Sequence, residues 1–168
     1  VFYVTWQNML KRCYSPSHQD KNPSYKGCSV CDEWLIFSNF KKWMESEPYE
    51  NKELDKDLLG GGSGVYSPNN CVFLNKVVNR FIEESKASRG STLIGTHFNK
   101  DRNKYESYCN HPITKKKIHL GRYDSEIDAH LDWKLKKLQI SNELISMGLI
   151  DDERVKIAII NRYSHGNK

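Results

Sequence analysis

The chain has 168 residues, 38% hydrophobic and 28% charged, which is the composition of a globular protein with a modest core. No run of about 18 apolar residues occurs, so a membrane-spanning helix is excluded and no membrane partner is expected. A net charge of +5 favours an anionic partner, and five cysteines, an odd number, favour a cytoplasmic protein with free or metal-bound thiols over a secreted disulfide framework.

The first elements expected along the chain are two helices separated by a polar loop. Residues 4–14 place apolar side chains near helical spacing, and residues 15–24 (SPSHQDKNPS) indicate a loop punctuated by prolines. Residues 31–46 predict an amphipathic helix. Its apolar face contains Trp34, Phe37, Phe40, Trp43 and Met44.

Residues 53–79 (ELDKDLLGGGSGVYSPNNCVFLNKVVN) have the order of a strand, a glycine-rich turn, a second short strand and the start of a helix. The helix is expected to begin near Leu74 and to end near Glu84. The small polar stretch that follows predicts a linker at 87–92, between a first module at 1–86 and a second at 93–150.

The second module predicts three antiparallel strands followed by a helix. The strand segments are GTHFNK, KYESYCN and KKKIHLGRY, which alternate in character and are separated by turns. Ser125 is the expected N-cap of the helix, with Asp128 at the capping-box position and Gly148 at its end. Residues 151–168 form a C-terminal segment and tail, for which a short helix is favoured over a strand.

The basic excess of the chain falls on this second module. Residues 91–123 contain seven Lys/Arg and two acidic residues, a net charge of 7 − 2 = +5, so the rest of the chain sums to zero. A basic excess gathered in one module is typical of a surface that binds a polyanion, most often nucleic acid. A solvated basic face is the alternative.

Residues 93–140 resemble the AP2 DNA-binding domain. The resemblance rests on Gly95, on Lys104-Tyr105 and on the run LGRYDS at 120–125, which precedes a helix containing Ala129. It implies that a three-stranded sheet lies in the DNA major groove, with the helix packed behind the sheet.

Strand alternation divides the sheet residues between two faces. The face toward the helix is expected to hold Phe98, Tyr105, Ser107, Cys109, Ile118 and Leu120. The DNA-binding face is expected to hold His97, Asn99, Lys104, Glu106, Tyr108, Asn110, Lys117 and His119. These groups can hydrogen-bond base edges or phosphates, although the AP2 family uses mostly Arg and Trp there. An ordinary polar sheet face is the alternative.

The first module is similar to phage-encoded HNH homing endonucleases that pair such a module with an AP2-like domain. The matching motifs are W-x-N-M-L-x-R-C-Y, Y-x-G-C-x-V-C-x-E-W and LDKDLL…YSPNNCVF. The resemblance implies a ββα hairpin in which Asp55 and Asn79 hold one Mg²⁺ ion and Asn70 braces the loop. Lys56 falls at the position of the general base, which is usually a histidine.

Lysine is a poor general base at this position. Its ordinary pKa is about 10.4, and the flanking acids Asp55 and Asp57 favour the charged form. Asp57 itself, or His18 in the preceding loop, could accept the proton instead. The sequence therefore indicates an impaired nuclease site without excluding cleavage.

Four cysteines of the first module raise the prospect of a structural zinc site. Cys28 and Cys31 form a C-x₂-C pair, and Cys13 and Cys71 lie in motifs that flank the hairpin. Buried free cysteines are the alternative and are favoured over Zn²⁺.

These patterns together predict an α+β protein, with an HNH-like ββα module and flanking helices followed by an AP2-like three-stranded antiparallel sheet packed on a helix. The expected function is sequence-specific binding of double-stranded DNA as a transcriptional regulator, a repressor with an impaired nuclease site. The alternative is a Mg²⁺-dependent HNH homing endonuclease or nickase. A homodimer through the segment after Asp151 would suit a repressor, and no small-molecule substrate is expected.

Overall fold

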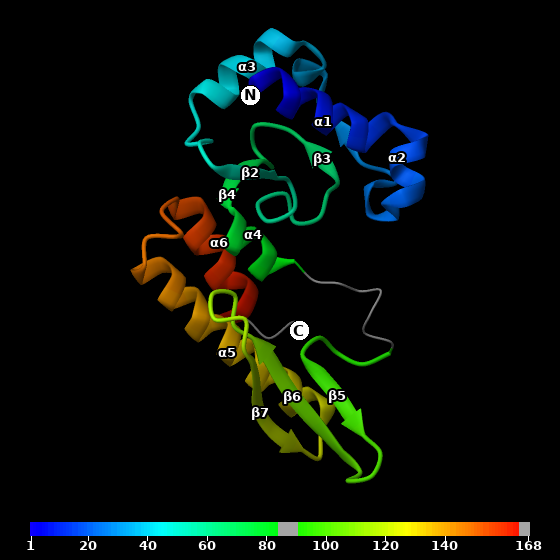
Figure 1. The fold of residues 1–168 in the computed structure, drawn as a ribbon, viewed down its shortest axis with the longest axis vertical. Coiled ribbons are helices and arrows are strands. Elements are labelled where there is room, and N and C mark those ends of the chain that lie inside the picture. The colour runs from blue at the N-terminus through cyan, green and yellow to red at the C-terminus, as the bar shows by residue number, and fades with distance from the viewer. Residues whose placement is uncertain (84–90, 165–168) are drawn as a thin grey trace. The chain divides into compact units, whose positions relative to one another are not determined.

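The structure, a computed structural model, describes residues 1–83 and 91–164. Contacts divide the chain into two compact units, Val1–Lys76 and Val77–Lys168. Both contain helices and strands, so the predicted α+β class is confirmed (Figure 1). The division falls before the predicted linker at 87–92, most of which lies outside the described residues. In the described residues, no helix is long and apolar enough to cross a membrane.

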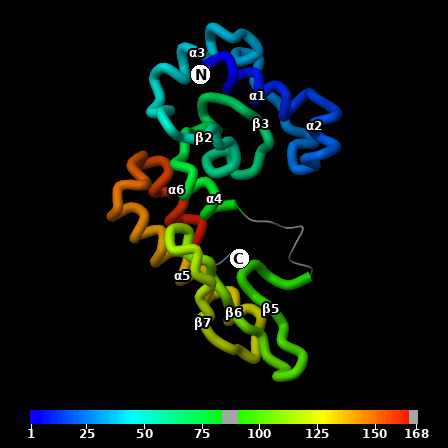
Figure 2. Tube along the Cα trace, viewed as in Figure 1, coloured from blue at the N-terminus to red at the C-terminus, as the bar shows by residue number. Residues whose placement is uncertain are grey.

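The first unit consists of short helices around two small pairs of strands, and Figure 2 traces this path as a tube. Its helices are α1 (Phe2–Tyr14), α2 (Pro16–Lys21) and α3 (Phe37–Glu45), with two 3₁₀ helices, η1 (Pro23–Tyr25) and η2 (Asp32–Leu35). Its strands are β1 (Ser29–Val30), β2 (Lys52–Asp55), β3 (Val65–Tyr66) and β4 (Val72–Asn75).

The core of this unit is aromatic and sulfur-rich. Trp34, Phe40 and Met9 are almost fully buried, and the rings of Trp34 and Phe40 meet edge to face at 5.1 Å between centroids. All four cysteines of the unit belong to this core or pack against it. Of the predicted apolar face of residues 31–46, Trp34, Phe40 and Met44 belong to the core and Trp43 packs against it, whereas Phe37 meets the rings of Tyr3 and Trp6.

The single helix predicted over 31–46 is wrong. The segment forms η2 and α3, separated by Ile36, whose backbone is extended at φ −97° and ψ 117°. The indole Nε1 of Trp6 donates a hydrogen bond to the carbonyl oxygen of Trp34 at 2.7 Å. The acceptor at this point of the chain is thus bonded to a side chain from α1. The polar loop predicted at 15–24 likewise contains two helical turns, α2 and η1.

The hairpin region contains one more strand than the sequence indicated. β2 and β4 pair antiparallel, with Asp55 opposite Val72, and the loop between them carries β3. β3 pairs with β1 in parallel, with Ser29 opposite Val65. Helix α4 (Lys76–Ile82) follows β4 directly, so Leu74, the predicted helix start, is a strand residue.

The second unit is built on a three-stranded antiparallel sheet in the order β5-β6-β7, as predicted. The strands are β5 (Thr96–Asn99), β6 (Lys104–Asn110) and β7 (Lys117–Tyr123). Two helices complete the unit, α5 (Glu126–Ser146) and α6 (Glu153–Ser164), and α5 covers one face of the sheet (Figure 1). The short helix favoured over a strand for the C-terminal segment is confirmed by α6.

Local sequence explains how α5 starts and how closely it packs on the sheet. The Ser125 hydroxyl accepts hydrogen bonds from the backbone N–H groups of Ile127 and Asp128, which confirms the predicted N-cap. Gly95, just before β5, lies against Trp133 of α5, and an added Cβ would come within 2.1 Å of the indole Cγ. A side chain at residue 95 would therefore push the sheet away from the helix.

α6 uses its apolar face inside the second unit. Val155, Ile159 and Tyr163 are buried, and α6 packs against α5. The ring of Tyr163 also meets that of Phe81 in α4 at 5.9 Å. The segment after Asp151, predicted as a dimer surface, thus contributes these three side chains to the unit itself, whereas Ile157 is exposed. A homodimer stays a prediction.

Candidate nucleic-acid interface

The sheet of the second unit presents one face away from α5, here called the outer face. The register pairs His97 with Glu106, Asn99 with Lys104, and Asn110 with Lys117, and directly paired residues point to the same side of a sheet. The predicted set of eight residues lies on this face: His97, Asn99, Lys104, Glu106, Tyr108, Asn110, Lys117 and His119.

The opposite, inner face packs on α5. Ser107 and Cys109 are buried there, as is Ala129 of the helix. The strand alternation read from the sequence therefore describes β5, β6 and the first half of β7 correctly.

A bulge in β7 adds one residue to the outer face that alternation alone did not place there. Ser107 pairs with Gly121 and Tyr108 pairs with His119, so the register skips Leu120. Beyond this irregularity the two faces exchange, and Arg122 points outward beside Glu106. Glycine inside a strand is a signal for a bulge, and Gly121 was the residue that could have indicated this exchange.

The outer face contains a compact group of cationic and aromatic side chains. The Lys117 ammonium lies 4.1 Å from the ring centroid of Tyr108, and the ring of His119 lies 5.0 Å from that of Tyr108. Lys104 forms an ion pair with Asp124. Lys117 is exposed, so its ammonium is open to an anion from solvent while it lies over the tyrosine ring.

Glu106 differs from the rest of the outer face because it is only 5% exposed. Its Oε2 accepts a hydrogen bond from the Tyr108 hydroxyl at 2.7 Å, and its Oε1 accepts one from Arg122 Nε at 3.1 Å. Asn99 donates a third at 3.2 Å. These bonds, foremost those from Tyr108 and Arg122, lower the pKa of Glu106 to about 2. The Glu106 carboxylate is thus enclosed by neighbouring side chains of the outer face, and its direct contact with DNA stays a prediction.

In the first unit, Asp55 lies at the end of β2, where the hairpin resemblance requires an aspartate. Its Oδ1 accepts hydrogen bonds from the backbone N–H groups of Asp57 and Leu58, at 3.1 and 2.8 Å. Burial raises the pKa of Asp55, although these two hydrogen bonds oppose the rise. One carboxylate oxygen is thus engaged in holding the start of the loop.

Lys56 is an interior residue of the first unit, 5% exposed. Its ammonium lies 2.6 Å from Asp57 Oδ1 and 5.6 Å from the ring centroid of Tyr66. Burial opposes the charged form, but the hydrogen bond and the charge of Asp57 leave the pKa of Lys56 raised above its ordinary value. A lysine held protonated in this way cannot accept a proton from water near neutral pH.

The other predicted residues of the nuclease-like site, Asn70, Asn79 and His18, do not share one cluster of contacts in the described residues. The Asn70 amide donates to the carbonyl oxygen of Val65 at 3.0 Å and to Ser63 Oγ at 3.1 Å, so it ties the loop together. Asn79 lies in α4 and belongs to the second unit, whereas Asp55 belongs to the first. His18 packs its ring 5.6 Å from that of Tyr25, and within the described residues its buried Nε2 has no hydrogen-bond partner.

All five cysteines are free thiols. Burial raises the pKa of Cys13 to about 11 and that of Cys71 to about 12, so these sulfurs are held in their neutral form. Over residues 1–83 and 91–164, no group of three or more His, Cys, Asp or Glu side chains is arranged to hold a metal ion. Both metal predictions therefore stay predictions from the sequence. They are Zn²⁺ at Cys13, Cys28, Cys31 and Cys71, and Mg²⁺ at Asp55 and Asn79.

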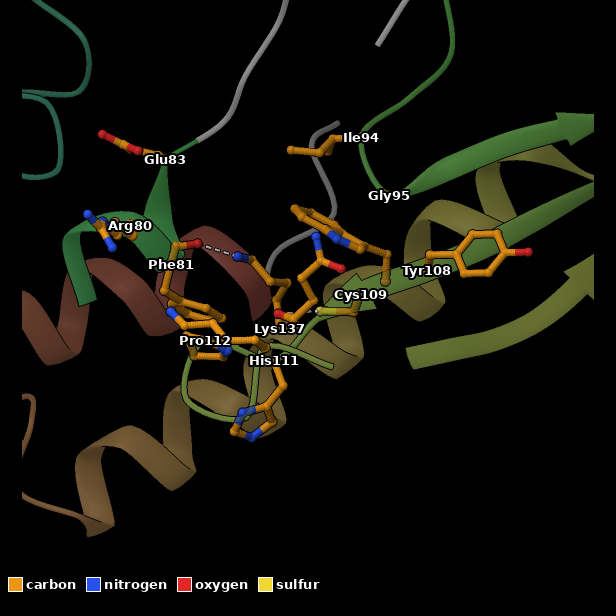
Figure 3. Close-up of a pocket in the computed structure, with 13 residues that line it drawn as sticks. Arg80, Phe81, Glu83, Ile94, Gly95, Tyr108, Cys109, His111, Pro112 and Lys137 are labelled. Atoms are coloured by element: carbon orange, nitrogen blue, oxygen red, sulfur yellow. Dashed lines mark hydrogen bonds between the residues drawn. The ribbon is translucent and has the colours of Figure 1, made fainter. Parts of the chain in front are cut away.

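A pocket of about 500 Å³ lies inside the second unit between α4, α5 and the end of β6 (Figure 3). Lys137 reaches across it, donates a hydrogen bond to the carbonyl oxygen of Phe81, and places its ammonium 3.6 Å from the Phe81 ring centroid. Trp133 and Tyr163 offer further ring faces to the same ammonium, at 5.5 and 5.3 Å. This cation therefore joins α4 to α5, a structural role.

Comparison of the chain with protein families, with curated proteins and with solved structures gives no match.

Proposed function

We propose that the protein binds double-stranded DNA in a sequence-specific manner through the outer face of β5, β6 and β7. The observation that supports this most directly is the composition of that face, which gathers Lys104, Lys117 and Arg122 with hydrogen-bonding side chains on a sheet backed by a helix. Such a sheet can enter the major groove, where base edges are distinguishable. The AP2-like resemblance of residues 93–140 points the same way.

The proposed role is that of a transcriptional regulator, a repressor derived from an HNH homing endonuclease. The raised pKa and burial of Lys56 support the loss of a general base at the hairpin. Asp55 stabilises the start of the same loop, because its Oδ1 accepts two backbone hydrogen bonds there. Binding without cutting is the function that these features favour over a Mg²⁺-dependent nuclease.

A paired binding and cleavage assay tests this function. Purified protein is incubated with labelled duplexes of random sequence in a gel-shift assay, and with supercoiled plasmid in buffer containing Mg²⁺ or Mn²⁺. We expect retarded duplex and intact plasmid from pH 7 to pH 9, because Lys56 stays protonated over that range.

Two outcomes contradict the proposal. Absence of any duplex retardation would remove the DNA-binding function. Metal-dependent cleavage that disappears in both Asp55→Asn and Asn79→Ala would make the protein a nuclease and not a regulator. Asp55→Asn is the better test at that position, because an asparagine oxygen can still accept the two backbone hydrogen bonds.

A further inference from the structure

The outer face contains a buried acid at its centre, which is unexpected on a surface that binds a polyanion. A carboxylate exposed there would repel phosphates. Glu106 avoids this because 93% of its side chain is enclosed and its charge is met by Arg122. Arg102 adds a second guanidinium at 3.9 Å. The acid is therefore built into the face as a support for neighbouring groups.

The support acts chiefly on Arg122. Arg122 and Glu106 are direct partners in the register, and Arg122 Nε donates to Glu106 Oε1 at 3.1 Å. The Arg122 side chain is nevertheless 51% exposed. An arginine whose Nε is fixed on a buried carboxylate keeps its guanidinium plane in one orientation and loses little entropy when it binds a second acceptor.

The hydrogen-bonding capacity left to such an arginine matches a guanine. Of the five N–H donors of a guanidinium, the single one on Nε is used by Glu106, and the four on the two terminal nitrogens form a planar fork. In the major groove, guanine presents two adjacent acceptors, N7 and O6, which an arginine fork meets with two hydrogen bonds.

Charge distinguishes a base from a phosphate as the target of Arg122. The ion pair with Glu106 cancels much of the attraction that the guanidinium would exert on an anionic phosphate, while its N–H donors remain directional. A neutral acceptor such as a base edge is then favoured. Lys117, whose ammonium lies over the Tyr108 ring, keeps a charge suited to phosphate.

We propose that Arg122, positioned by Glu106, recognises a guanine in the major groove and is a specificity-determining residue of the outer face. This inference rests on the proposed DNA-binding function. It assigns base recognition to a residue outside the eight predicted from strand alternation. Glu106 acts as a positioning residue through Arg122, with Tyr108 and Asn99 fixing the carboxylate.

The experiment is a selection from a duplex library with a randomised 20-base-pair core. It is performed with the full chain, with three single variants and with one double variant, Glu106→Gln in the Arg122→Ala background. We expect the wild-type protein to enrich a site containing a required guanine. Arg122→Ala should lose the preference at that one position, with discrimination falling about tenfold or more. Lys117→Ala is the control and should weaken binding to all sequences while leaving the guanine preference intact.

Glu106→Gln tests the positioning role. It should reduce discrimination at the same guanine as Arg122→Ala does, and it should have no further effect on that discrimination in the Arg122→Ala background. Replacing the required guanine by 7-deazaguanine, which lacks the N7 acceptor, should weaken wild-type binding and leave Arg122→Ala unchanged. Circular dichroism melting curves for each variant show whether the second unit is folded in the assay.

The outcomes separate the two proposals. If the library yields no enriched site because the protein does not bind duplex, the proposed function itself fails. If a site is enriched and Arg122→Ala keeps every base preference, or weakens all sequences equally, the assignment to Arg122 is overturned while DNA binding stands. If only Glu106→Gln unfolds, the 7-deazaguanine comparison between wild type and Arg122→Ala still decides the role of Arg122.

Discussion

The carboxylate of Asp55 caps the turn that opens the glycine-rich loop, and this role predicts different effects for two substitutions. Asp55→Ala removes the acceptor of two backbone hydrogen bonds and should lower the free energy of unfolding by about 1 to 3 kcal/mol. Asp55→Asn keeps an acceptor oxygen and removes a partly buried charge, so its stability at pH 7 should equal or exceed that of the wild type. Urea unfolding at pH 7 measures both.

The pH dependence of Asp55→Asn gives a control. An acid whose pKa is raised on folding stabilises the fold below its unfolded pKa, near 3.9, and that contribution is lost as the pH rises through the folded value. The asparagine variant should therefore gain stability relative to the wild type between pH 4 and pH 7. A difference that stays constant across this range would show that the Asp55 carboxylate carries no desolvation cost.

The opposite pKa shift at Glu106 predicts the opposite behaviour. Because hydrogen bonds from Tyr108 and Arg122 lower its pKa to about 2, Glu106 stabilises the second unit above the ordinary glutamate pKa near 4.3. This contribution disappears as the pH falls toward 2. Glu106→Gln should therefore lower the melting temperature at pH 7 and lower it much less at pH 2.5. Equal shifts at both pH values would mean that the ionised form is not specifically stabilised.

At the scale of elements, the contact between Gly95 and Trp133 predicts a strong glycine requirement. Gly95 has φ +81°, and an added Cβ would overlap the indole ring, so Gly95→Ala should destabilise the second unit by about 3 kcal/mol or more. Gly148 in the same unit has φ +70° with nothing within 4 Å of its would-be Cβ. Gly148→Ala, the matched control, should cost only about 1 kcal/mol. Chemical unfolding followed by tryptophan fluorescence compares the two.

The elements that could be predicted from the sequence are those whose signal is local. Period-two alternation and turn residues indicate β5, β6 and β7, and the N-cap at Ser125 indicates the start of α5. The split between η2 and α3 has no such local signal. The Trp34 carbonyl oxygen next to it accepts a hydrogen bond from Trp6, which lies 28 residues earlier in the chain. The parallel pairing of β1 with β3 is equally non-local and involves only two residues on each side.

The candidate site shows the same division between local and non-local information. Eight outer-face positions follow from alternation, but the outward position of Arg122 follows from a bulge. The enclosure of Glu106 depends on side chains from β5, β6 and β7 at once. From the sequence, Glu106 is only one negative charge in a basic segment. Its hydrogen bonds in the structure indicate a positioning residue.

At the scale of the whole molecule, the charge is divided unequally between the two units. Residues 1–76 contain 9 Lys/Arg and 9 Asp/Glu, whereas residues 77–168 contain 17 Lys/Arg and 12 Asp/Glu. The whole net charge of +5 therefore belongs to the second unit. Electrostatic attraction of a duplex, which depends on phosphate contacts and on the release of counterions, should accordingly be a property of that unit.

This distribution predicts how substitutions change the salt dependence of duplex binding. Lys117→Ala removes an exposed charge of the outer face, and the slope of log K against log salt should decrease in magnitude by about one unit. Lys104→Ala should have a smaller effect, because Asp124 already neutralises part of that charge. Lys42→Ala removes one exposed charge from the first unit, and its slope should match the wild type. Fluorescence anisotropy titrations between 50 and 300 mM KCl, roughly the range in which such slopes are linear, give all four slopes. If Lys42→Ala and Lys117→Ala change the slope equally, the duplex is attracted by net charge alone. That result would contradict the prediction that the outer face makes the phosphate contacts.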